Sequence, residues 1–159
     1  MGNVTYMGWS KQLETGIAFI DKQHQRIIAD INDLHKVSLQ TDQREVLAEV
    51  LNEMIDYLVK HFAFEEELLM ESGYAFAKAH ERMHFLFLKH LDDYHKRFEA
   101  GENVLPEILI MLKTWWERHI ATDDADYVAV VNHKFSGRDP VAAEWLSGTL
   151  KMHFAGKDA

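Results

Sequence analysis

Apolar residues recur at intervals of three and four along four long stretches of this chain, roughly residues 17–39, 43–71, 76–99 and 106–133. This spacing places the apolar side chains on one face of an α-helix, and no stretch shows the alternation typical of a β-strand. Short segments separate the stretches, and Gly73 and Gly101 stand where two of the helices are expected to end. The sequence therefore predicts an all-α fold, an antiparallel up-down four-helix bundle.

The chain of 159 residues is long enough for one domain with a hydrophobic core. We expect the bundle to occupy residues 1–135, in which residues 1–16 form an N-terminal arm without helical periodicity. Residues 136–159 are expected to form a C-terminal extension, a short helix that begins near Pro140 and packs on the bundle. Docking of a partner protein is the alternative role for this extension.

Charge and composition exclude several classes of partner. The net charge of −9 leaves no basic stripe for nucleic acid, and the absence of cysteine excludes disulfides and thiolate metal sites. The first residues lack the basic and apolar segments of a signal peptide. No apolar run reaches the ~18–20 residues of a membrane span. We expect a cytoplasmic protein, and we expect it to be monomeric.

Side chains of the kinds that bind metals interrupt the apolar face of every predicted helix. Residues four apart share a helix face, so the pairs on the second and third helices are placed to bind the same ion. Unpaired polar groups in a core cost roughly 1–3 kcal/mol each, which makes a purely structural role for so many of them costly. The pattern predicts a two-metal site in the bundle core. Its candidate ligands are His24, His61, Glu65, His80, His84, His119, and Asp123 or Asp124.

The spacing in the fourth helix leaves two candidates for its carboxylate ligand. Asp124 follows His119 by five residues, a spacing that turns an ideal α-helix by about 140° away from the first side chain. Either Asp123 is the ligand, or the helix widens locally as a π-bulge does. The spacing alone does not decide between these alternatives.

The donor set also limits what the site can bind. Two octahedral metal ions offer about twelve coordination positions. Five imidazoles, two bridging carboxylates and one bridging oxo or hydroxo group leave about one position open, on one metal only. Such a site suits a small diatomic ligand and leaves little room for an organic substrate.

Four stretches of the sequence resemble the hemerythrin family, specifically its bacterial single-domain members. They are residues 16–24 (GIAFIDKQH), 61–74 (HFAFEEELLMESGY), 80–84 (HERMH) and 119–124 (HIATDD). The resemblance, to which Trp9 adds, implies two iron ions joined by an oxo or hydroxo bridge, and Asp124 as the ligand. It implies one iron on His80, His84 and His119, an iron with the open position on His24 and His61, and bridging by Glu65 and Asp124.

The resemblance further implies a function. A member of this family would bind O2 reversibly, as hydroperoxide on the open iron, and would carry, store or deliver oxygen without being an enzyme. Its partners would be O2 and a reductase or O2-consuming protein. An O2 or redox sensor and a di-iron oxidase or peroxidase are alternatives on the same fold. A ferritin-like di-iron enzyme is a further alternative, since Glu81-x-x-His84 and Asp21-x-x-His24 resemble its motif, but it leaves His61, His80 and His119 without a role.

An apolar pocket would protect bound O2 from water and protons. The residues that could line it stand beside the ligands or one helical turn away, and plain core packing is an equal alternative for each. Trp116 departs from the family pattern, in which a smaller aliphatic residue is usual. Asp21 is expected either to hold an imidazole in place or to be an ordinary acid of a first helical turn. The pocket candidates are Ile27, Ile28, Phe62, Trp115, Trp116 and Ile120.

Overall fold

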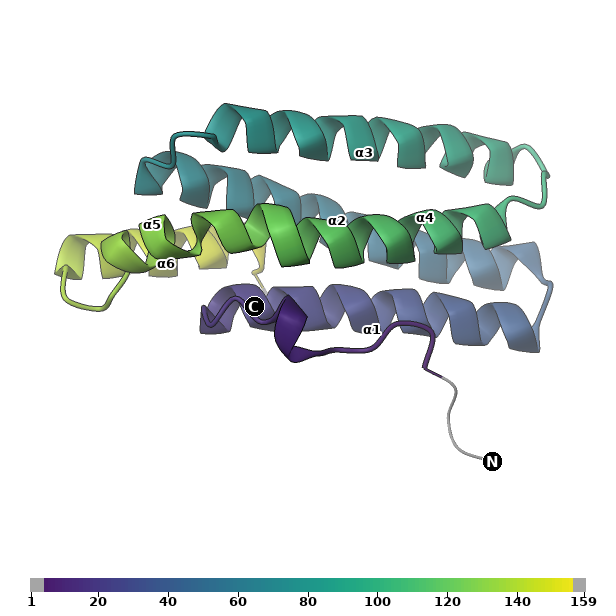
Figure 1. Ribbon diagram of the computed structural model, residues 1–159. Coiled ribbons are helices and arrows are strands. Elements are labelled where there is room, and N and C mark those ends of the chain that lie inside the picture. Colours follow the sequence, from purple (N-terminus) through teal and green to yellow (C-terminus); the bar gives the residue numbers. More distant parts are fainter. Residues whose placement is uncertain (1–4, 156–159) are drawn as a thin grey trace.

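The computed structural model describes residues 5–155, and within them the chain forms an antiparallel up-down bundle. In Figure 1 the chain reverses direction at each short connection between the long helices. The described residues contain no strand, which confirms the predicted all-α class. The bundle helices are α1 (Ala18–Gln40), α2 (Arg44–Ser72), α3 (Ala77–Glu99), and a fourth made of α4 (Leu105–Arg118), the π-helical turn η2 (His119–Asp124) and α5 (Ala125–Lys134).

The helix ends follow signals that are visible in the sequence. Gly73 ends α2 in the left-handed conformation (φ 75°), and its N–H donates to the carbonyl groups of Leu69 and Met70. Pro106 lies in the first turn of α4, where its missing N–H costs no helical hydrogen bond. The observed ends differ from the predicted ones by no more than one residue.

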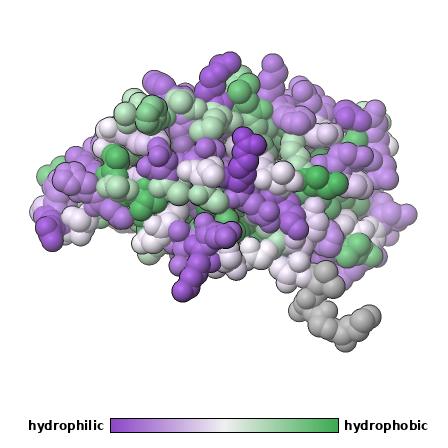
Figure 2. All heavy atoms as spheres, in the orientation of Figure 1, coloured by the Kyte–Doolittle hydropathy of each residue, from purple (hydrophilic) through white to green (hydrophobic). Residues whose placement is uncertain are grey.

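The apolar faces of the helices meet in one core along the bundle axis. Ile20, Ile31, Leu51 and Leu112 are fully buried there, and each such side chain stabilises the fold by about 1.5–3 kcal/mol. Figure 2 shows hydrophilic residues over most of one face of the molecule, with small apolar groups between them. Among the described residues, no helix has the length and apolar character needed to cross a bilayer.

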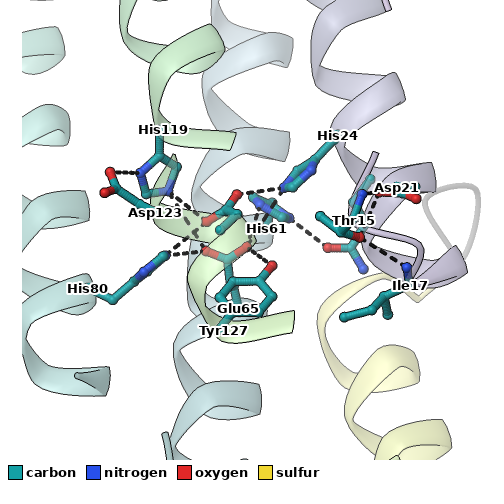
Figure 3. A network of polar contacts seen from close by, with 12 residues as sticks. Thr15, Ile17, Asp21, His24, His61, Glu65, His80, His119, Asp123 and Tyr127 are labelled. Carbon is teal, nitrogen blue, oxygen red and sulfur yellow. Dashed lines mark hydrogen bonds and ion pairs between the residues drawn. The ribbon is translucent and has the colours of Figure 1, made fainter. Parts of the chain in front are cut away.

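Two polar side chains of α1 hold the N-terminal arm. Asn32 accepts a hydrogen bond from the N–H of Met7 and donates one to its carbonyl oxygen, both at 2.8 Å. The Asp21 carboxylate accepts from the N–H and hydroxyl of Thr15 at 2.8 and 2.7 Å, and from the N–H of Gly16 at 3.1 Å (Figure 3). Asp21 therefore fixes the arm at the start of α1, and its hydrogen bonds do not go to an imidazole.

The chain beyond the bundle forms α6 (Pro140–His153), which packs against α2. Asp139 begins this helix by accepting a hydrogen bond from the N–H of Val141 at 3.0 Å. Phe154 is only 2% exposed, and its ring centroid lies 5.6 Å from that of Tyr57 and 5.7 Å from that of Phe64. Residues 1–4 of the expected arm and 156–159 of the expected extension lie outside the described residues.

We expect Phe154→Ala to lower the free energy of unfolding by about 3 kcal/mol, because it leaves a cavity between α6 and α2. Met152 is a matched control on the same helix, since its side chain is 65% exposed. Met152→Ala should change the same quantity by less than about 0.5 kcal/mol. Urea denaturation followed by circular dichroism measures both. Equal, small effects would contradict the packing of this segment on α2.

Candidate metal centre

The structure brings the seven candidate ligands together in the middle of the core. Each of them is at most 1% exposed. Figure 3 shows the imidazoles of α1, α2, α3 and η2 pointing toward Glu65 from different sides. The seven side chains come from four helices: His24 from α1, His61 and Glu65 from α2, His80 and His84 from α3, and His119 and Asp124 from η2.

These side chains form two overlapping groups. In one, the ligand atoms of His80, His84, His119 and Glu65 all lie within 4.8 Å of one another. In the other, those of His24, His61 and Glu65 do. We call them the three-histidine group and the two-histidine group. Their unequal size corresponds to the division that the family resemblance implies.

Glu65 belongs to both groups because its two oxygens face in different directions. Oε1 lies 2.7 Å from Nε2 of His80 and 3.2 Å from Nε2 of His84, in the three-histidine group. Oε2 lies 3.3 Å from Nε2 of His61 and 3.8 Å from Nε2 of His24, in the two-histidine group. The carboxylate is therefore placed to bridge two ions.

Asp124 repeats this arrangement from the opposite helix. Its Oδ1 lies 3.2 Å from Nε2 of His80 and 3.1 Å from Nε2 of His119. Its Oδ2 lies 3.1 Å from Nε2 of His24. Each of the two buried carboxylates thus offers one oxygen to each histidine group.

The π-helical turn explains why Asp124 reaches the centre. The wider turn of η2 returns positions five apart to one side of the helix, so of the two alternatives that the spacing left open, the structure has the local widening. Asp124 is fully buried, whereas the Asp123 side chain is 34% exposed. Asp123 instead accepts a hydrogen bond from Nδ1 of His119 at 3.0 Å. It orients an imidazole and does not face the centre.

Two further side chains form hydrogen bonds to the candidate ligands and hold them in place, and sequence reasoning missed both. Nδ1 of His61 donates to Oε1 of Gln23 at 2.7 Å, which turns Nε2 of His61 toward the centre. The Tyr127 hydroxyl donates to Oε2 of Glu65 at 3.0 Å and restrains that carboxylate. Tyr127 follows Asp124 by three residues, and this helical spacing is the signal that could have identified it.

The donor chemistry of the cluster fits a pair of iron ions. Nδ1 of His24 has no hydrogen-bond partner, and Nε2 of His24, Nε2 of His61 and both oxygens of Asp124 form no regular hydrogen bond and have only the ion-pair contacts given above. Leaving such atoms unpaired costs about 1–3 kcal/mol each unless they bind something. A mixed set of imidazole nitrogens and carboxylate oxygens suits iron, whereas calcium prefers oxygen ligands alone.

Charges inside the cluster shift the pKa values of its members. Burial raises the pKa of both carboxyls, but the neighbouring imidazoles outweigh it and hold the pKa of Glu65 and of Asp124 below the usual range. Burial lowers the pKa of His24, but Asp124 and Glu65 outweigh it and raise that pKa to about 9. The same balance raises the pKa of His80 to about 10 and that of His119 to about 9. These three imidazoles therefore carry protons at neutral pH when no metal is bound.

The two tryptophans among the pocket candidates contact different histidine groups most closely. The Trp116 ring centroid lies 5.7 Å from that of His24 and 5.8 Å from that of His61, the two-histidine group. Trp115 stacks on His119 at 4.2 Å, in the three-histidine group. Trp116 is therefore the aromatic candidate that contacts both histidines of the smaller group.

The other candidates are buried as well. Phe62 stacks on His84 with ring centroids 3.8 Å apart, and it also contacts the Trp116 ring at 5.7 Å. Phe62 thus lies between the two histidine groups. The aliphatic candidates are all core residues, at most 5% exposed: Ile27, Ile28 and Ile120.

The ferritin-like alternative is wrong. Its motif needs Glu81 as a ligand, but this side chain is 47% exposed and pairs with Lys78 at 3.6 Å. Asp21, the other carboxylate that this alternative needs, is held by the N-terminal arm. Neither carboxylate belongs to the buried cluster.

Comparison with known proteins agrees with the site. Residues 15–131 match the family described as the hemerythrin HHE cation binding domain. The chain is 44% identical to a bacteriohemerythrin of Stenotrophomonas maltophilia, over 92% of this chain and 96% of that protein. It is 41% identical to one of Pseudomonas aeruginosa, over 95% and 99%. The structure is similar to that of a wild-type hemerythrin (TM-score 0.74, 31% identity, 79% of this chain and 97% of that one). This chain belongs to the hemerythrin family.

Proposed function

We propose that this chain binds O2 reversibly at a non-heme di-iron centre and serves as an oxygen carrier, store or delivery protein. Membership of the hemerythrin family implies O2 binding at a non-heme iron site. One observation carries the finer proposal: five buried imidazoles divide unequally around two carboxylates, Glu65 and Asp124, and each carboxylate faces both groups. Unequal groups leave one metal with fewer protein ligands, and therefore able to take an external one.

The two histidine groups would each hold one iron, and Glu65 and Asp124 would bridge the pair. When bound, the iron pair supplies two electrons to O2 on binding and recovers them on release. The protein's part is to hold the nitrogen and oxygen donors in place. Gln23 and Asp123 accept hydrogen bonds from Nδ1 of His61 and His119, and this leaves the Nε2 atom of each ring for the metal.

The surrounding rings exclude water from the two-histidine group. Trp116 and Phe62 are at most 1% exposed and contact each other as well as the histidines. A dry, apolar enclosure limits the supply of protons that would release the two-electron-reduced ligand as hydrogen peroxide. This favours return of the ligand as O2 over one-way oxidation of the iron.

Oxygen titration tests the proposal. Protein loaded with ferrous iron under anaerobic conditions should hold about two iron ions per chain, enough to fill two octahedral sites. O2 should produce a visible absorption band that disappears when O2 is removed and returns when it is restored. Irreversible loss of the band, with release of peroxide, would instead indicate an oxidase.

Replacing the two neighbouring aspartates one at a time should distinguish a metal ligand, Asp124, from a residue that only orients a ligand, Asp123. Asp124→Ala removes a carboxylate that faces both groups, and we expect the two-iron centre to be lost. Asp123→Ala is the matched control: it removes only the acceptor of His119, so both irons should still bind, with affinity lowered by about 10–100-fold. Metal analysis after gel filtration, with circular dichroism as a check of folding, measures both. Wild-type iron content in Asp124→Ala would contradict the proposed bridge.

Metal binding should also expel protons. The metal requires neutral imidazoles, but pKa values of about 9, 10 and 9 keep His24, His80 and His119 protonated at pH 7 in the metal-free protein. Apparent affinity should therefore rise as the pH increases from 6 toward 9, and fall in acid. Calorimetric titration with Mn²⁺ in two buffers of different ionisation enthalpy counts the protons released. An affinity independent of pH would rule out this charge state.

A further inference from the structure

We infer that Nε1–H of Trp116 donates a hydrogen bond to the ligand that binds beside His24 and His61. The side chain would then select small molecules that accept a hydrogen bond, such as O2 and small anions. This inference rests on the proposed function, because it places that ligand on the iron of the two-histidine group.

The first observation is an unpaired donor in the core. Trp116 is 0% exposed, and its Nε1 has no hydrogen-bond partner. The indole N–H can only donate, and roughly nine-tenths or more of buried polar groups in folded proteins are paired. A purely apolar side chain would fill the same space without this cost. The unpaired N–H therefore indicates an acceptor that the polypeptide does not provide.

The second observation is the position of the ring. Its centroid lies 5.7 Å from that of His24 and 5.8 Å from that of His61, with interplanar angles of 61° and 49°. The Nε2 atoms of both histidines face the buried carboxylates, at 3.1 Å from Asp124 for His24 and 3.3 Å from Glu65 for His61. The ring that carries the unpaired donor therefore lies against both histidines of the two-histidine group.

The other aromatic neighbours of the ring offer no strong acceptor. Phe62 stacks on it at 5.7 Å, Trp115 meets it edge to face at 5.5 Å, and the His119 ring lies 5.9 Å away. Nδ1 and Nε2 of His119 already face Asp123 and Asp124. Aromatic faces accept hydrogen bonds only weakly, so these contacts do not satisfy the indole N–H.

The chemistry of the ligand then decides how much the donor contributes. O2 that has taken up electrons, and an anion such as azide, both carry negative charge toward the donor. A hydrogen bond to a charged acceptor in a site shielded from water changes affinity by about tenfold or more. The donor would therefore act on ligand affinity with no effect on how the irons are held.

Azide binding to the diferric protein tests this. Trp116→Phe keeps an aromatic ring and removes the N–H, while Trp116→Leu removes both. Trp145→Phe is the matched control, since Trp145 lies on α6 and packs on Phe135. We expect both Trp116 variants to keep the wild-type iron content and to bind azide about tenfold or more weakly. The Trp145 variant should bind azide as the wild type does.

A vibrational measurement separates the hydrogen bond from the size of the side chain. In protein refolded and loaded in D2O, the stretching frequency of bound azide should shift relative to H2O, and both Trp116 variants should lose this shift. Unchanged azide affinity in Trp116→Phe, or a shift that persists, would overturn the inference alone. Tighter binding in both variants would show that Trp116 only restricts space, and would overturn it too. A wild-type protein without two irons would overturn the proposed function and this inference together.

Discussion

The contact on which the rest of the structure depends is that between two buried carboxylates and five imidazoles. Glu65 and Asp124 are fully buried. A carboxylate tolerates this position only with charged or hydrogen-bonding partners around it. Those partners come from every helix of the bundle. Apolar stripes alone would let the helices slide or rotate past one another, since Leu and Ile pack in many registers. The requirement that all seven side chains meet at one depth removes that freedom.

The π-helical turn shows how far the chain departs from regular geometry to meet this requirement. An unbroken α-helix would direct His119 and Asp124 to different sides, so the fourth helix widens over six residues and then resumes. The wider turn also leaves Asp123 at the edge of the cluster, where it accepts a hydrogen bond from His119 and orients that imidazole. The local widening of the helix is thus what brings Asp124 into the buried cluster.

The bundle and most of the cluster could be predicted from spacing alone, because helical periodicity is local and side chains four apart must share a face. His61 with Glu65, and His80 with His84, are of this kind. Asp124 is different: local geometry favoured neither it nor Asp123, and only the family resemblance distinguished them. Gln23 could not be found in this way, because a hydrogen bond between helices depends on the rotation and depth of each helix. Tyr127 was missed although its position, three residues after Asp124, could have identified it. Phe154 was missed for a similar reason, since it follows the last turn of α6 and belongs to no periodic stripe.

Anomalous X-ray diffraction at the iron edge, from crystals of the iron-loaded protein, tests the central claim most directly. The account predicts two adjacent iron peaks, one beside His80, His84 and His119 and the other beside His24 and His61, with Glu65 and Asp124 touching both. A single peak, or peaks away from these side chains, would contradict it.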